Sequence, residues 1–348
     1  MKMQSPVQSK ANQAAFTLLE LMVSMSITLI LLGVVTYLTS LSSDTFRESR
    51  DEVRSARQAK EALDAIGKDF EAMVVRNDGS GNMWLYAAVE PELDGDNVAN
   101  TTLAGPANKK MTNAARLIFF AGAADRYDGD IGGASDNGGD VCAVSYRLAY
   151  RDQISDLNPD NANAHPVFSL YRHVVDPDDS FSGKKDSNGN HVAARALLGV
   201  ADLESVWSTG SATTNPPSYE SEDFSAENVL VENIYQMTTT FLVLNNAGVQ
   251  RITIGHEDPE VAPAGPYYAL CVKGNGVYRV DAKPASDPIS LADWGAAING
   301  GQLIGVEITI TVLSDRGLSM ARYSGMSRGE IIAEYGHHYT RTINVPRS

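Results

Sequence analysis

A single apolar segment near the N-terminus constrains the fold of this chain more than any other feature. Residues 16–41 read FTLLELMVSMSITLILLGVVTYLTSL and contain one charged side chain, Glu20. A bilayer core about 30 Å thick needs roughly 20 apolar residues in a helix that rises about 1.5 Å per residue. The segment is therefore long enough to cross a membrane as a helix.

The residues before this segment predict its orientation. Residues 1–15 contain Lys2 and Lys10 and no acidic residue. Basic flanks stay on the cytoplasmic side, so we expect a cytoplasmic N-terminus and a head on the other side of the membrane. The alternative is a cleaved secretory signal peptide, whose apolar region would span only about 7–15 residues. The length of the run and the early position of Glu20 favour a membrane span.

The carboxylate of Glu20 is unfavourable in this position. Insertion of a charged residue costs about 2.5–3.5 kcal/mol at the centre of a membrane helix and less near its ends, and such residues usually have a partner and a function. No Lys or Arg lies within residues 16–41. The partner of Glu20 must therefore come from outside the span.

The string AAFTLLEL at residues 14–21 resembles the signal of type IV prepilins and type II secretion pseudopilins. The resemblance implies that a prepilin peptidase cuts between Ala15 and Phe16 on the cytoplasmic side and N-methylates Phe16. It also implies that Glu20, the fifth residue after the cut, pairs with the N-terminal amine of a neighbouring subunit during assembly. The family usually has Gly before the cut, whereas this chain has Ala15.

A second helical pattern follows the span directly. Within residues 44–76, apolar residues recur at steps of three, four and seven: Val53, Ala56, Leu63, Ile66, Phe70 and Met73. This stripe predicts one continuous helix over about residues 16–76, whose later part packs on the protein's own sheet. An independent coiled coil is the alternative, but the stripe is short for one. The turn-forming string NDGSG at 77–81 is expected to end the helix.

The negative charge of the chain belongs to the remaining residues. The 348-residue chain has 28 Lys and Arg against 43 Asp and Glu, which gives a formal net charge of -15. Residues 1–43 carry +1 and residues 44–76 carry -1, so residues 77–348 carry -15. Such an acidic head is a poor candidate for binding nucleic acid through bulk charge, because phosphate binding requires a basic face.

The head, residues 77–348, reads as mainly β-structure. Segments rich in β-branched and aromatic residues alternate with Gly, Asp, Asn and Pro clusters, which predicts strands at 83–89, 116–120, 141–150, 167–172, 231–244, 249–254, 267–272, 276–280, 303–313 and 338–345. The segment 198–205 is ambiguous between helix and strand. Polar stretches at 90–113, 125–140, 152–166, 176–191 and 208–223 are expected to be surface loops.

The order of motifs in the head adds a narrower resemblance. VSYRL at 144–148, LYR at 170–172, LVENIYQM at 230–237, VEITITV at 306–312 and the final TRTINV are similar to minor pseudopilin J and the W-type minor pilins. They also resemble the prepilin-like Verru/Chthon cassette protein C group. The resemblance implies an α+β, pilin-like fold: a leader (1–15), a transmembrane helix (16–41), an amphipathic helix (42–76) and a head with a mainly antiparallel sheet and long loops.

Candidate chemistry in the head is sparse. The sequence has no G-x-S-x-G, H-E-x-x-H, Walker or C-x-x-C motif, so we expect neither an enzyme nor a cofactor. The adjacent His337 and His338 would point to opposite faces of a strand, which disfavours a metal site. Acidic residues within 125–140 and the string DSNGN at 186–190 only partly imitate calcium-binding loops, so solvated turns are favoured over a metal site.

The two cysteines leave two alternatives open. Cys142 and Cys271 lie in separate predicted strands, in a part of the chain expected outside the cytoplasm. A disulfide can form there, but buried thiols are equally common.

Three classes of function follow from these patterns. The first is a non-enzymatic minor pilin or pseudopilin, held in the bacterial inner membrane and partnered by prepilin peptidase and other pilin subunits. The second is an adhesin or substrate-recruiting module at a filament tip, for which the acidic loops are the argument. A membrane-anchored enzyme is the least favoured.

Overall fold

The computed structural model describes residues 17–90, 114–122, 141–151, 167–210, 213–255, 268–281, 294–295, 297–323, 326 and 328–346. The chain divides into two units, residues 1–51 and 52–348. Helix α1 (Leu18–Glu71) contributes residues to both units. Among the described residues, α1 is the one helix long and apolar enough to cross a membrane. The α+β, pilin-like fold class is confirmed, because a long apolar N-terminal helix precedes antiparallel sheets.

Helix α1 ends five residues before the predicted limit of residue 76. Its last helical residue is Glu71, after which Met73 forms an isolated antiparallel bridge with Ala121. The backbone N–H of Val74 donates to the carbonyl of Phe120 at 2.8 Å. The chain therefore leaves the helix because its backbone groups pair with the end of a strand instead.

A seven-stranded sheet forms the centre of the head, with all pairs antiparallel. Its strand order is β5-β4-β3-β2-β1-β8-β9. The strands are β1 (Met83–Glu90), β2 (Ala114–Ala121), β3 (Cys142–Arg151), β4 (Val167–Val175), β5 (Val229–Glu232), β8 (Ala269–Lys273) and β9 (Gly276–Val280).

A second, four-stranded antiparallel sheet has the order β11-β10-β6-β7. It contains β6 (Ile234–Asn245), β7 (Gly248–Ile254), β10 (Gln302–Leu313) and β11 (Gly336–Asn344). The predicted strand at 231–244 is split between β5 and β6, which belong to different sheets. Asn233 separates them with φ 66°, a left-handed conformation that interrupts an extended strand.

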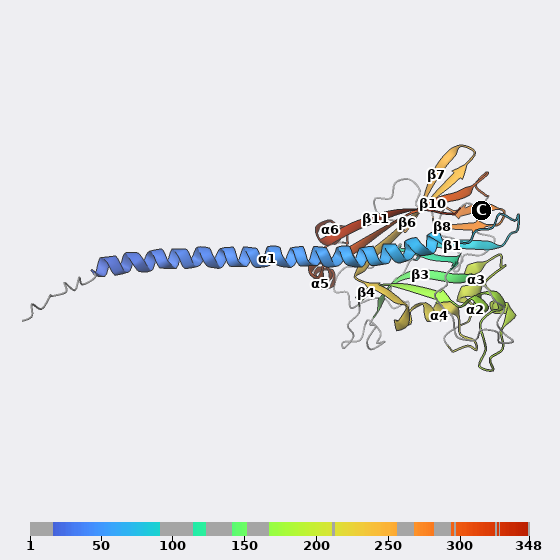
Figure 1. Cartoon of the computed structure of the whole chain (residues 1–348), viewed down its shortest axis with the longest axis horizontal. Coiled ribbons are helices and arrows are strands. Elements are labelled where there is room, and N and C mark those ends of the chain that lie inside the picture. The colour runs from blue at the N-terminus through green and yellow to red at the C-terminus, as the bar shows by residue number, and fades with distance from the viewer. Residues whose placement is uncertain are drawn as a thin grey trace, which may run out of the picture. The chain divides into compact units, whose positions relative to one another are not determined.

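Two hydrophobic cores lie on opposite faces of the seven-stranded sheet (Figure 1). One face packs against residues 59–73 and the four-stranded sheet, with Ile66 and Phe70 of α1 fully buried. Helices α5 (Asp315–Tyr323) and α6 (Arg328–Tyr335), which the sequence pattern did not predict, pack Leu318 and Ile331 on the same core.

The opposite face is covered by a segment that we call the cap, residues 176–210 and 213–228. The cap contains α2 (Pro177–Ser182), η2 (Ala193–Arg195), α3 (Leu203–Ser208), α4 (Tyr219–Asp223) and η3 (Ala226–Asn228). The prediction of surface loops at 176–191 and 208–223 was therefore wrong for α2 and α4, whereas residues 183–191 form no helix or named strand and residues 187–190 are exposed. Trp207 and Tyr219 of the cap are buried in the second core. The segment 198–205, which the sequence left ambiguous between helix and strand, includes the first residues of α3.

The structure contains no disulfide between Cys142 and Cys271, and both residues are buried. Cys142 lies in the core beside α1, whereas Cys271 lies in the core beneath the cap. Strands β2 and β1 separate their strands, a spacing of about 14 Å at about 4.8 Å per strand. The structure therefore excludes a disulfide between these two cysteines, because bridged cysteines need Cα atoms within about 7 Å.

Candidate assembly site

Glu20 lies in the first turn of α1, where the helix is capped by Thr17. The backbone N–H of Glu20 donates to the Thr17 side-chain oxygen at 3.3 Å, and that of Leu21 donates to the Thr17 carbonyl at 3.2 Å. A negative charge is favoured at a helix N-terminus by the helix dipole. Glu20 is exposed, so its carboxylate is accessible to another chain.

Six hydroxyl groups of α1 are satisfied within the helix. Each of them donates to a carbonyl three or four residues earlier, at 2.7–3.0 Å: Ser24, Ser26, Thr28, Thr36, Thr39 and Thr45. Such internal bonds make polar residues compatible with lipid. Glu20 differs from these residues, because no carbonyl of the helix can satisfy a carboxylate.

The predicted processing residues Ala15 and Phe16 lie outside the described residues. Cleavage between them and methylation of Phe16 therefore stay predictions. The acidic stretch at 125–140, considered for calcium, also lies outside the described residues.

A buried ion pair holds the later part of α1 on the seven-stranded sheet. The Asp69 carboxylate accepts two hydrogen bonds from Arg172 of β4, both at 2.8 Å, and one from the Tyr146 hydroxyl of β3 at 2.5 Å. Tyr146 and Arg172 lie directly opposite each other in the β3–β4 pair. Burial and the Asp69 charge raise the pKa of Tyr146 well above 10, so its hydroxyl remains a donor.

These two residues belong to the VSYRL and LYR motifs, but the sequence pattern did not predict their shared partner. A signal was present, because Asp69 precedes Phe70 on the apolar side of the helix, where an acid needs a buried partner.

The strand β11 makes a second connection to α1. Arg341 donates to the Asp64 carboxylate at 2.6 Å and to the carbonyl of Leu63 at 3.2 Å. It also reaches Glu71 at 3.3 Å. Gly67 permits this approach, because a Cβ atom there would lie 2.6 Å from the guanidinium carbon of Arg341.

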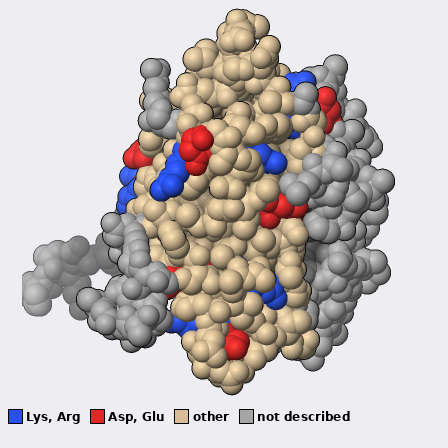
Figure 2. Space-filling view, turned by 90° about the vertical axis from the view of Figure 1, so that its right-hand side faces the viewer, with Lys and Arg blue, Asp and Glu red and all other residues tan. Residues whose placement is uncertain are grey.

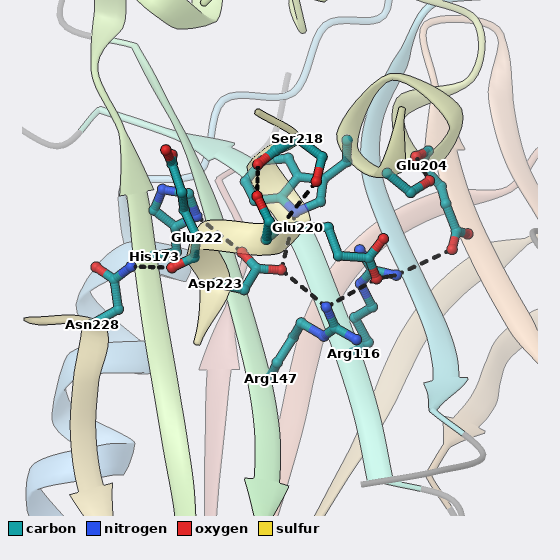
Figure 3. Close-up of polar contacts among 12 residues, drawn as sticks. Arg116, Arg147, His173, Glu204, Ser218, Glu220, Glu222, Asp223 and Asn228 are labelled. Atoms are coloured by element: carbon teal, nitrogen blue, oxygen red, sulfur yellow. Dashed lines mark hydrogen bonds and ion pairs between the residues drawn. The ribbon is translucent and has the colours of Figure 1, made fainter. Parts of the chain in front are cut away.

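A buried polar cluster joins the cap to the opposite face of the sheet (Figure 3). Its centre is Asp223 of α4, whose side chain is 1% exposed. His173 Nδ1 lies 2.9 Å from one Asp223 oxygen. Arg147 Nη1 and Trp207 Nε1 donate to the other oxygen at 3.3 and 3.0 Å. Residues of β3, β4 and α3 therefore converge on one carboxylate of α4.

The same cluster continues through two further ion pairs. Arg147 bonds Glu220 at 3.0 Å, and Arg116 of β2 bonds Glu204 of α3 at 3.2 Å. Burial tends to raise the pKa of Asp223, but the hydrogen bond with His173 and the charges of Arg147 and Arg116 outweigh it and lower that pKa. The cluster is thus an electrostatic attachment of the cap, since its charges are directed at one another.

Within the described ranges, no group of three or more His, Cys, Asp and Glu side chains is arranged to hold a metal ion. His338 of β11 instead lies 3.0 Å from the Thr311 hydroxyl of β10. The face of the head in Figure 2 shows few charged side chains among the described residues. Most of the net negative charge of residues 77–348 lies outside the described residues, because the basic residues of the described segments offset most of their acidic residues.

Comparison with protein families identifies one segment of the chain. Residues 10–36 match the prokaryotic N-terminal methylation motif. The match includes Ala15, Phe16 and Glu20, and it supports a pilin-type subunit that is processed by prepilin peptidase. Neither the curated proteins nor the solved structures gave a match. The motif therefore bears on the N-terminal helix, while the head is interpreted from its own structure.

Proposed function

We propose that the chain is a non-enzymatic minor pilin or pseudopilin. A prepilin peptidase cleaves it before Phe16, and it is assembled from the inner membrane into, or at the tip of, a type II secretion pseudopilus or type IV pilus. Its N-terminus would be cytoplasmic before cleavage, and its head periplasmic. The placement beside minor pseudopilin J and the W-type minor pilins rests on the VSYRL and LYR motifs.

One observation carries the proposal: the methylation motif at residues 10–36 leads directly into a membrane-length helix with an acid in its first turn. Six hydroxyl groups of that helix donate to its own carbonyl groups, but Glu20 requires an external cation. A free amine at the mature N-terminus of a neighbouring subunit would supply one. Pairing of this kind would tie membrane insertion to assembly.

The substitution Glu20→Gln tests this proposal. It keeps the side-chain volume and removes the charge, so we expect normal membrane insertion and loss of the chain from purified filaments. Ser24→Ala is the matched control, because Ser24 lies one turn later and its hydroxyl is bonded within the helix. Immunoblots of membrane and sheared-filament fractions measure both steps. Assembly of Glu20→Gln at the level of the unmodified chain would contradict the proposed pairing.

A further inference from the structure

Strand β11 is an edge of the four-stranded sheet, and β10 is its one strand partner among the described residues. It pairs with β10 over nine residues in one continuous register, without a bulge. By comparison, the edges of the seven-stranded sheet are β5 with four residues and β9 with five. Natural edge strands are usually protected by charged side chains, Pro, a bulge or a covering segment, and the one Lys or Arg of β11, Arg341, is turned to α1 rather than to the outer edge. Strand β11 contains neither Lys nor Pro, and His338, Thr340, Thr342 and Asn344 are exposed.

The register shows which backbone groups of β11 face outward. Val345 N–H donates to the Ile304 carbonyl, and Ser314 N–H donates to the Tyr335 carbonyl. Hydrogen-bonded and non-bonded pairs alternate in an antiparallel ladder. The residues of β11 that bond β10 are therefore the odd-numbered ones, and the even-numbered residues direct their N–H and C=O groups away from the sheet. These are the same residues whose side chains are exposed.

The opposite edge of this sheet offers a matching strand. The four strands are all antiparallel to their neighbours, so the edge strands β11 and β7 run in opposite directions. A second copy in the same orientation would therefore present β7 antiparallel to β11. Antiparallel pairing between different edges is heterologous, so a pair of copies keeps one β7 edge and one β11 edge available for a further subunit.

Side chains on the two edges are compatible with this pairing. Val249 of β7 is 57% exposed. The one cation of β7, Arg251, is paired with Glu307 of β10 at 2.9 Å. The outward residues of β11 carry no Lys, Arg, Asp or Glu, so like charges would not be placed opposite each other. Arg341 links β11 to α1, the helix that would lie beside its counterpart in a filament.

We propose that the edge of β11, which pairs with β10 alone among the described strands, is a strand-addition surface that receives the β7 edge of a second copy of this chain. The four-stranded sheet would then continue from one subunit to the next through backbone hydrogen bonds. This inference rests on the proposed function, because a common membrane orientation is what aligns the two copies.

Cysteine crosslinking of the full-length chain in membranes tests the pairing. Two differently tagged copies carry Thr342→Cys on β11 and Val249→Cys on β7, and a short bismaleimide is added. The native cysteines are buried and serve as the unreactive background. We expect a crosslinked dimer between the two different variants and none between two copies of Thr342→Cys. A crosslink between two Thr342→Cys copies, a crosslink of β11 only to a different protein, or no crosslink would each overturn the inference.

A backbone variant adds a control for folding. Thr340→Pro removes an outward N–H and keeps the bonds to β10, so we expect loss of the dimer crosslink; Thr340→Val keeps the N–H and should retain the crosslink. Retention of the crosslink by Thr340→Pro would overturn the inference. Filament recovery is scored in parallel. A chain present in filaments without a β7–β11 crosslink overturns this inference alone, whereas a crosslinked chain that never enters filaments contradicts the proposed function.

Discussion

At the scale of single residues, Asp69 is the acid that fixes α1 to the head. Its side chain is 8% exposed and that of its partner Arg172 is 22% exposed, so both charges are largely removed from water. The hydrogen bond with Asp69 raises the pKa of Arg172, which keeps the guanidinium group charged. Tyr146 donates the third bond.

Removal of the Asp69 charge should loosen this attachment. Asp69→Asn leaves Arg172 without its counter-ion, so we expect the free energy of unfolding to fall by about 3 kcal/mol. Equilibrium urea denaturation in detergent, followed by tryptophan fluorescence, measures the change. Glu61→Gln is the control, because Glu61 is exposed on the same helix and its loss should cost less than about 0.5 kcal/mol. Equal stabilities for the two variants would show that the ion pair does not hold the helix.

At the scale of elements, the cap depends on ionised Asp223. Its pKa is lowered in the folded protein, so its contribution to stability is complete above the unfolded value of about 3.9 and is lost as pH falls through the folded value. We expect the cap to separate from the sheet in acid, with a change in the fluorescence of Trp207. The Trp207→Phe variant identifies that signal among the three tryptophans.

The variant Asp223→Asn provides the matching test of this acid response. It should lower the free energy of unfolding by about 3–5 kcal/mol at neutral pH, because Arg147 and His173 lose a buried partner. It should also remove the cap's acid transition, while exposed Glu227→Gln should preserve it. An unchanged acid transition in Asp223→Asn would assign the pH dependence to another carboxylate.

The strands were predictable from the sequence, whereas the cap was not. Alternation of apolar and polar residues locates β10 to within one residue, since its buried face repeats every second position. The cap helices have only five or six residues, too few for helical periodicity. Their caps were nevertheless visible as Asp202 and Ser218, each bonded to the backbone three residues later. The partners of Asp223 could not be predicted, because sheet pairing between distant segments brings them together.

At the scale of the whole molecule, two parts with different chemistry make up the chain. The first is an apolar helix start that carries the methylation motif and Glu20. The second is a two-sheet head, attached to the later part of α1 by Asp69 and Arg341. The methylation motif could be recognised from the sequence because its residues are contiguous in the chain. The head's interaction surfaces required the register of its strands.

We propose above all that this chain is processed as a prepilin-type subunit. Mass spectrometry of the N-terminal peptide, from full-length chain produced together with a prepilin peptidase, tests it most directly. We expect a mature chain that lacks residues 1–15 and begins with N-methylated Phe16. A chain that retains Met1, or that begins at any residue other than Phe16, would contradict processing as a prepilin.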